Sequence, residues 1–206
     1  MRILRLILFF SVAIAAAIAS EAAAAEDQEP APPTTANASE FIRTSCETTQ
    51  YPELCYHSLS GYANAVQQDP ARLALVAIGV SLSRATGMSA YLANLTRGRN
   101  RNDFSDPRAA AALRDCSAVF GDAVSQMRGS INQMRRLSTF GEELRFQMSN
   151  VQTWMSAALT NEETCTDGFD GVMDDPIKID VCDRTVSVKE VTSNALALVN
   201  SFAANC

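Results

Sequence analysis

Four segments of this chain repeat apolar residues at steps of three or four, and this spacing constrains the fold more than any other feature. One stripe of this kind per segment is typical of an amphipathic helix that packs against other helices. The stripes run from Leu75 to Leu95, from Leu113 to Met134, from Leu144 to Ala158 and from Val188 to Phe202. We therefore predict an all-α fold, with an up-down-up-down four-helix bundle over residues 71–206.

The breaks between the stripes support four separate helices. The stretch "RGRNRNDFSDP" ends the first pattern, and Asp106 followed by Pro107 predicts an N-cap and a first helical residue. "LSTF" and Gly141 separate the second segment from the third. "CTDGFDGVMDDP" holds two glycines and a proline, which predicts a turn-rich linker before the fourth helix.

The N-terminus predicts a secreted protein. Residues 1–25 place Arg2 and Arg5 before an apolar run and small residues, which is typical of a cleaved signal peptide. Cleavage is expected after residue 19 or 25; an uncleaved membrane anchor is the alternative. Residues 26–38 are polar and rich in proline, so we predict a disordered leader there, followed by a folded domain over residues 39–206.

Secretion predicts that disulfides form among the six cysteines, because disulfides persist in oxidising compartments. All six follow the expected cleavage sites. Cys46 and Cys55 are nine positions apart with Pro52 between them, so they pair only if the chain turns back there. A bond between Cys116 and Cys165 would join the second and third bundle helices.

Cys182 and Cys206 flank the fourth apolar stripe. Their expected positions at opposite ends of a helix argue against a bond between them. We expect Cys206 to be free or to join two copies of the chain as a dimer. Two sequons, at Asn37 and Asn94, are candidate N-glycosylation sites.

The charge balance argues against nucleic acid or an anionic membrane as a partner. The net charge of the whole chain is −6, and loss of Arg2, Arg5 and Glu21 with the signal peptide makes it −6 − 2 + 1 = −7. A basic partner would be favoured electrostatically.

No residue pattern predicts an enzyme, a metal site or a cofactor. The single histidine, His57, matches no catalytic motif, and we interpret it as a surface residue. The run Asp167, Asp170, Asp174 and Asp175 does not fit a calcium loop, because Lys178 stands at the twelfth position. The physical features therefore favour a binding module.

Four stretches of the sequence resemble one known family. They are "FIRTSCETTQYPELC", "DPRAAAALRDCSAVFGDAV", "VQTWMSAALTNEETCTDGF" and "VSVKEVTSNALALVNSF". Together, in this order and spacing, they resemble the plant invertase/pectin methylesterase inhibitors. The resemblance implies a helical hairpin over residues 39–70 before the bundle. It also implies pairing of Cys46 with Cys55 and of Cys116 with Cys165.

The same resemblance implies a non-enzymatic protein that binds a plant cell-wall enzyme 1:1 in the apoplast. Invertase inhibitors have a Pro-Lys-Phe motif between the second and third bundle helices, and here that connection reads "RRLSTFGEELRF". The third helix, "SAALTNEETCTDGF", is more similar to pectin methylesterase inhibitors. Pectin methylesterase is therefore the expected partner. Inhibition of invertase and a non-inhibitory bundle of the same fold are the alternatives.

An inhibitor of this kind is expected to cover the pectin cleft of the esterase with its second and third bundle helices. Similarity to the family motifs points to Asp122, Ser125 and Thr164. Helical periodicity adds outward-facing residues beside them. These are Gln126, Gln152, Thr153 and Ser156.

Overall fold

The computed structural model describes residues 33–98 and 106–206. The predicted signal peptide, residues 1–25, and the first part of the predicted leader, residues 26–32, lie outside these ranges. Within them every regular element is helical and none is a strand. The described residues all belong to one compact unit.

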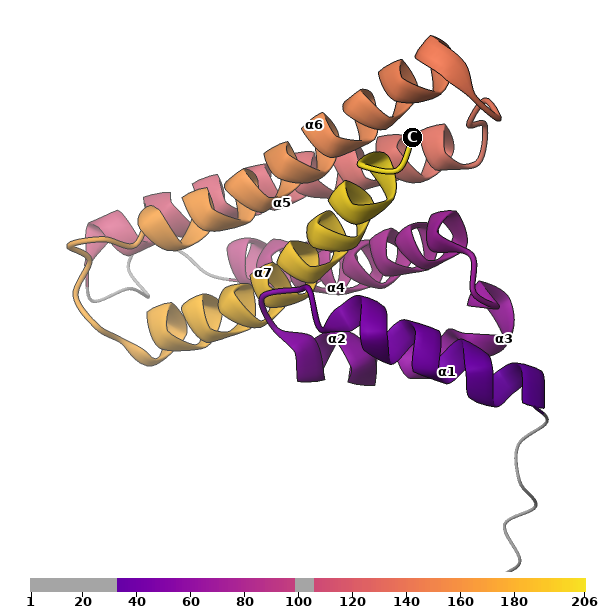
Figure 1. The fold of residues 1–206 in the computed structure, drawn as a ribbon. Helices are drawn as coiled ribbons and strands as arrows, with labels where there is room; N and C mark the ends of the chain where they lie inside the picture. Colours follow the sequence, from indigo (N-terminus) through magenta and orange to yellow (C-terminus); the bar gives the residue numbers. More distant parts are fainter. Residues whose placement is uncertain (1–32, 99–105) are drawn as a thin grey trace, which may run out of the picture. The chain divides into compact units, whose positions relative to one another are not determined.

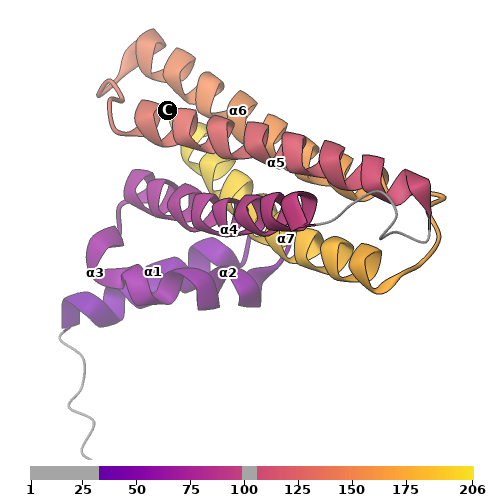
Figure 2. The ribbon, with the colours of Figure 1, turned by 180° about the vertical axis from the view of Figure 1, so that it is seen from behind.

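Four long helices form the bundle. They are α4 (Pro70–Gly98), α5 (Pro107–Met134), α6 (Gly141–Asp167) and α7 (Pro176–Ala203). Each packs against the helix before or after it in the chain, and α4 also packs against α7, so the four close into a ring. Figures 1 and 2 show α5 and α6 side by side along their lengths. The predicted all-α, up-down-up-down bundle is confirmed.

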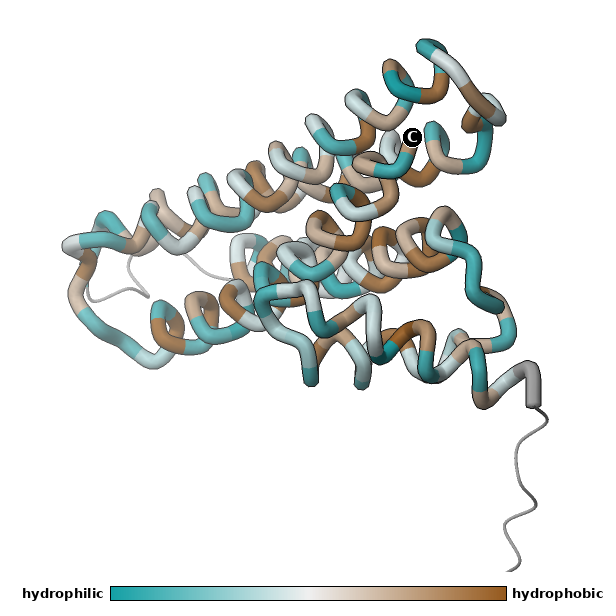
Figure 3. The backbone as a smooth tube through the Cα atoms, in the orientation of Figure 1, coloured by the Kyte–Doolittle hydropathy of each residue, from teal (hydrophilic) through white to brown (hydrophobic). Residues whose placement is uncertain are grey.

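The predicted stripes form the core of the bundle. Ile78 and Leu92 from α4, Phe120 and Met127 from α5, and Met155 from α6 are fully buried. Brown, apolar segments recur along the helices in Figure 3, with polar segments between them. By length and composition α4 could cross a membrane, but its apolar residues contribute to this core.

Aspartate and proline start two of the bundle helices. Asp106 accepts a hydrogen bond from the backbone N–H of Arg108 at 2.9 Å, with Pro107 at the first helical position. Asp175 accepts bonds from the N–H groups of Ile177 and Lys178 at 2.8 Å. The first helix start agrees with the sequence prediction, whereas α7 begins twelve residues before Val188, where its apolar stripe starts.

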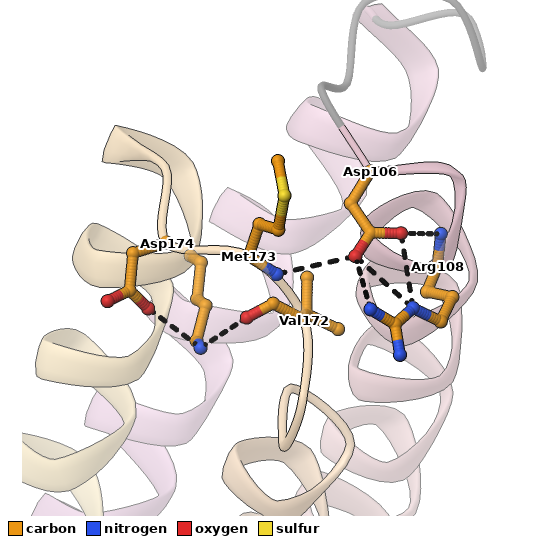
Figure 4. Close-up of polar contacts among 6 residues, drawn as sticks. Asp106, Arg108, Val172, Met173 and Asp174 are labelled. Carbon is orange, nitrogen blue, oxygen red and sulfur yellow. Dashed lines mark hydrogen bonds and ion pairs between the residues drawn. The ribbon is translucent and has the colours of Figure 1, made fainter.

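Asp106 also attaches the α6–α7 linker to the start of α5 (Figure 4). Its Oδ2 accepts from Arg108 Nη2 at 2.8 Å and from the N–H of Met173 at 3.3 Å. Nearby, Lys178 donates to the carbonyl of Val172 at 2.7 Å and pairs with Asp174 at 2.9 Å. Two members of the acidic run therefore have structural partners, because Asp174 forms this ion pair and Asp175 caps α7.

The N-terminal region is built from short helices: α1 (Pro33–Cys46), α2 (Pro52–Leu59), the 3-10 turn η1 (Ser60–Tyr62) and α3 (Ala63–Val66). The Cys46–Cys55 disulfide joins α1 to α2 with a Cα–Cα distance of 5.6 Å. The predicted hairpin is therefore present. Its first helix begins at Pro33, so the part of the predicted disordered leader from 33 to 38 is helical instead. Ala38 is buried, which explains why residues 33–38 fold as the start of α1.

One side-chain amide fixes the turn of this hairpin to the bundle. Asn194 of α7 accepts a hydrogen bond from the N–H of Tyr51 at 3.0 Å and donates one to its carbonyl at 2.9 Å. Leu59 of α2 is buried at the same junction, beside Ala77 of α4 and Ala195 of α7. The hairpin thus covers the seam between α4 and α7 at the level of Ala77 and Ala195.

The remaining two cysteines are free thiols, and they do not pair with each other. Cys182 lies inside α7 rather than before it, which corrects its expected position at the helix end. Cys206 follows the end of α7, and its thiol donates to the carbonyl of Phe202 at 3.4 Å. Burial raises the pKa of both thiols.

Candidate functional site

The surface of α5 and α6 collects most of the residues that the sequence singled out, and we call it the α5–α6 face. Three contacts define how the two helices lie against each other. The Cys116–Cys165 disulfide joins them with a Cα–Cα distance of 4.2 Å. Further along, the side-chain amide of Asn161 donates to Gln126 at 3.0 Å. The Trp154 ring then lies against Gly129, so the helices run antiparallel.

Gly129 allows α5 and α6 to approach closely. A Cβ atom at this position would lie 3.3 Å from Cε3 of Trp154, which is closer than ordinary van der Waals contact. Trp154 is the single tryptophan of the chain and is half-buried. It lines a surface groove between the two helices with Gln133 and Gln147. The pairing of Trp154 with a glycine on another helix could not be predicted from spacing.

Two of the three predicted residues of α5, Asp122 and Ser125, are exposed. Asp122 lies between Cys116 and Gln126 along the chain, at the level where α6 presents Asn161 and Thr164. The Ser125 hydroxyl donates to the carbonyl of Gly121 at 3.1 Å. Asp122 therefore supplies a negative charge at the edge of α5 nearest α6, and Ser125 lies beside it.

The two predicted glutamines are less available than expected. Gln126 is half-buried and bonded to Asn161 of α6. Gln152 is half-buried too, and its amide donates to Asn200 of α7 at 2.9 Å. Gln152 thus lies on the side of α6 that faces α7, away from α5. Both were expected to point outward, and both instead join neighbouring helices at the margins of the exposed surface.

The outward side of α6 is a row of hydroxyl side chains, all exposed. It comprises Ser149, Thr153, Ser156, Thr160 and Thr164. The steps of three and four residues place the five on one side of the helix. Thr153, Ser156 and Thr164 were predicted; Ser149 and Thr160 were missed, although the same spacing could have found them.

These hydroxyls present acceptor atoms to the outside. The Thr153 hydroxyl donates to the backbone carbonyl of Ser149 at 2.8 Å. The Thr164 hydroxyl donates to the backbone carbonyl of Thr160, also at 2.8 Å. Because the protons of Thr153 and Thr164 are used within the helix, the lone pairs of these two oxygens remain for a partner. Together with Asp122, the row forms a surface that accepts hydrogen bonds and favours a partner with N–H or cationic groups.

Behind this face the bundle buries one carboxyl group, that of Glu162. Its Oε1 accepts from Thr192 of α7 at 3.0 Å, and its Oε2 has no hydrogen-bond partner among the described residues. Burial raises its pKa to about 8, although Thr192 and the charge of Lys189 act in the opposite direction. The side chain is therefore neutral in mildly acidic solution.

The described residues form no cluster suited to catalysis or to metal binding. In residues 33–98 and 106–206, no three His, Cys, Asp or Glu side chains gather closely enough to hold an ion. His57 is exposed on α2. What the α5–α6 face can do chemically is bind another molecule through shape, one carboxylate and a row of acceptors.

Comparison with known proteins gives this surface a context. The family described as plant invertase/pectin methylesterase inhibitor matches residues 40–198. A 21 kDa protein of Daucus carota is 44% identical over 171 residues, covering 82% of this chain and 86% of its own length. Pectinesterase inhibitor 9 of Arabidopsis thaliana is 41% identical over 180 residues, with 84% and 85% covered.

Solved structures agree on the fold. A crystal structure of a mutant pectin methylesterase inhibitor from Arabidopsis superimposes with a TM-score of 0.60 at 20% identity, covering 77% of this chain and 95% of the other. The family match spans most of the described helices and both disulfides, and two relatives exceed 40% identity. The chain therefore belongs to the plant invertase/pectin methylesterase inhibitor family.

Proposed function

We propose that this chain inhibits pectin methylesterase by laying its α5–α6 face across the pectin-binding cleft of that enzyme in a 1:1 complex. The observation that supports this most directly is the exposed hydroxyl row of α6 beside Asp122. It offers a long surface of acceptors with little charge of its own. Relatives named pectinesterase inhibitor 9 and pectinesterase inhibitor 11 are 41% and 40% identical to this chain, which favours the esterase as the target.

Such an inhibitor would act by excluding substrate, with no covalent step. The face is held rigid by the Cys116–Cys165 disulfide at one end and by the contact of Trp154 with Gly129 further along. A rigid surface loses little conformational entropy on binding, so more of the contact energy appears as affinity. Donor groups in the cleft of the esterase, which bind the hydroxyls of pectin, could donate hydrogen bonds to the Ser and Thr oxygens of α6 instead.

The test is a titration of esterase activity with the purified inhibitor and two variants, one that reverses a charge and one that introduces a charge. Asp122→Arg and Thr164→Arg place a bulky cation within the proposed interface, so each should weaken inhibition at least tenfold. The matched controls are Asp183→Arg on α7 and Thr86→Arg on α4, both exposed and outside the α5–α6 face. These controls should inhibit like the unmodified protein.

Two results would contradict the proposal in different ways. If all four variants inhibit equally, the interface lies elsewhere on the molecule. If the unmodified protein leaves the esterase active, the inhibitory function itself is wrong. A parallel titration of acid invertase covers the alternative target, and loss of neither activity would support a non-inhibitory bundle.

The proposal includes secretion to the cell wall. Two intramolecular disulfides favour an oxidising compartment. Asn37 on α1 and Asn94 on α4 are exposed, so the structure leaves room for a glycan at both sequons. Intact-mass measurement and N-terminal sequencing of protein collected outside plant cells would give the cleavage site, expected after residue 19 or 25, and the occupancy of each sequon.

A covalent dimer through Cys206 is the remaining part of the proposal. Its half-buried thiol has a raised pKa, so little thiolate is present at neutral pH and oxidation should be slow. We expect a disulfide-linked dimer only under added oxidant. On a non-reducing gel, Cys206→Ser should abolish it and Cys182→Ser should not; the reverse pattern would assign the bond to Cys182.

A further inference from the structure

The seam between α4 and α7 lies across the bundle from the α5–α6 face, because the four helices pack in a ring. Two contacts fix how α4 and α7 align. The Tyr91 hydroxyl bonds the Asp180 carboxylate, and the Ser81 hydroxyl donates to the carbonyl of Val191 at 3.3 Å. The helices are thus antiparallel, and the register between these contacts places Gly87 opposite Arg184.

The N-terminal hairpin covers only one half of this seam. At the level of Ala77 and Ala195, Leu59 of α2 fills the surface between the helices. The other half is an open groove. Its lining residues are Arg84, Gly87, Met88 and Tyr91 from α4 with Arg184, Ser187 and Val188 from α7.

Arg184 is held in position at this groove. Its Nε donates to Oδ1 of Asp180 at 2.9 Å, and its guanidinium carbon lies 4.6 Å from the centre of the Tyr91 ring. Hydrogen bonds from Arg184 and Tyr91 keep the pKa of Asp180 below its usual value, so this carboxylate stays charged. Besides Asp180 and the Tyr91 hydroxyl, Arg184 has no hydrogen-bond partner among the described residues.

Arg84 is the second cation of the groove. It is exposed and forms no ion pair or hydrogen bond with any residue in the described ranges. It precedes Gly87 by three residues, about 4.5 Å along the helix axis. A Cβ atom at Gly87 would meet nothing within 4 Å, so the surface between the two arginine positions is open.

We propose that this groove binds the carboxylates of a linear uronic acid oligosaccharide, with Arg84 and Arg184 as the anion-binding residues. A guanidinium group matches a carboxylate with two parallel hydrogen bonds, and Arg184 is already oriented for this. The Tyr91 ring and the Ser187 hydroxyl supply an apolar surface and a polar contact for a sugar ring. The offset of the two arginines along α4 and α7 suits a chain of acidic units better than a single small anion.

The choice of a uronate rests on the proposed function, because de-esterification of pectin leaves free carboxylates on the polymer. Since the groove and the α5–α6 face lie on opposite sides of the bundle, the inhibitor could hold the demethylated polymer and the esterase at once. Asp183 and Glu190 lie on the neighbouring outer side of α7 by helical spacing, so the attraction should be modest and weakened by salt.

The experiment measures binding of unesterified trigalacturonate to the full secreted chain by titration calorimetry at low ionic strength. Fully methyl-esterified trigalacturonate and inorganic sulfate serve as comparison ligands. We expect Arg84→Gln to weaken trigalacturonate binding about tenfold or more, because a charged bond is lost. Arg114→Gln, which removes the same charge from an exposed position of α5, should bind normally. Because Arg84 is exposed and makes no ion pair or hydrogen bond with the described residues, its replacement should leave folding unchanged.

Three outcomes would overturn the inference: no binding of trigalacturonate, equal weakening by Arg84→Gln and Arg114→Gln, or equal binding of sulfate or the methyl ester. Esterase inhibition is measured on the same samples and separates the two proposals. Loss of trigalacturonate binding with intact inhibition by Arg84→Gln supports the groove alone. Trigalacturonate binding without any esterase inhibition would remove the proposed function and leave the groove.

Discussion

Thr192 of α7 donates a hydrogen bond to the carboxyl group of Glu162 of α6 at 3.0 Å, and both side chains are completely shielded from solvent. The second carboxyl oxygen has no partner among the described residues. An ionised carboxylate is expensive to bury without full hydrogen bonding, so this environment favours the protonated form of Glu162. The buried carboxyl group of Glu162 therefore makes the folded state more stable at low pH than at high pH.

The free energy of unfolding should fall as pH rises. The pKa of Glu162 is about 8 in the folded chain against 4.5 for the model compound, so the folded state binds the extra proton. The stabilisation is complete below pH 4.5 and is lost as the pH rises through about 8. Denaturant unfolding at pH 5, 6.5 and 8 would measure it. Glu162→Gln should flatten this dependence, and an equal slope in both proteins would contradict the assignment.

Asp106 should give the opposite dependence on pH. Hydrogen bonds from Arg108, and then from the N–H of Met173, lower its pKa to about 2. Its contribution to stability is therefore present above pH 3.8 and lost as pH falls through 2. Asp106→Asn keeps an N-cap but removes the charge, so it should lower the melting temperature at pH 6 and have little effect at pH 2. Asp115→Asn, exposed on the same helix, is the control; equal shifts in both variants would argue against the pair with Arg108.

Substitution of Gly129 should displace the tryptophan. Gly129→Val inserts atoms where a Cβ already lies 3.3 Å from the Trp154 ring, and overpacking of this kind costs about 1–3 kcal/mol. Gly121→Val changes the same helix at a site with nothing within 4 Å of the new Cβ. Because the chain has one tryptophan, its emission spectrum reports the displacement directly. A shift in both variants, or in neither, would show that Gly129 is not needed for the ring to pack.

The two disulfides should differ in what they contribute. In the chain-entropy model the Cys116–Cys165 bond is worth about 4 kcal/mol, because it closes a long loop, and the Cys46–Cys55 bond about 3 kcal/mol. Replacing each pair by alanine and measuring the free energy of unfolding in urea tests the order. If replacing Cys46 and Cys55 lowered the free energy of unfolding more than replacing Cys116 and Cys165, strain or residual structure would outweigh loop length.

The sequence predicted the four bundle helices because their buried stripes are long and regular, and a core requires such periodicity. It placed the start of α7 too late, since the first turns of that helix mix Ile177 and Val181 with Asp180 and Arg184. The pair Asp175-Pro176 has the same form as Asp106-Pro107 and could have revealed the true start. The helical segment 33–38 was missed because its proline-rich composition indicated disorder. Among the described side chains of this segment only Ala38 is buried and anchors it, and one residue is too weak a signal in the sequence.

The candidate site was predictable in outline only. Helical periodicity correctly predicted that Thr153 and Ser156 are exposed, and the family motifs pointed to Asp122 and Thr164, which are exposed too. The roles of Gln126 and Gln152 depend on which helix packs on each side, and a single helix does not contain that information. Trp154 illustrates the same limit, since its partner Gly129 is 25 positions away on another helix.

The attachment of the hairpin through Asn194 has a consequence for how the molecule opens. The hairpin is closed by its own disulfide, so it would stay closed if it separated from the bundle. Separation requires loss of the two bonds between Asn194 and Tyr51 and of the packing of Leu59 beside Ala77 and Ala195. Because the hairpin has the smaller share of the core, we expect it to open before the bundle helices do. Amide exchange at Tyr51 would record that opening, because its N–H is protected by a side chain of α7.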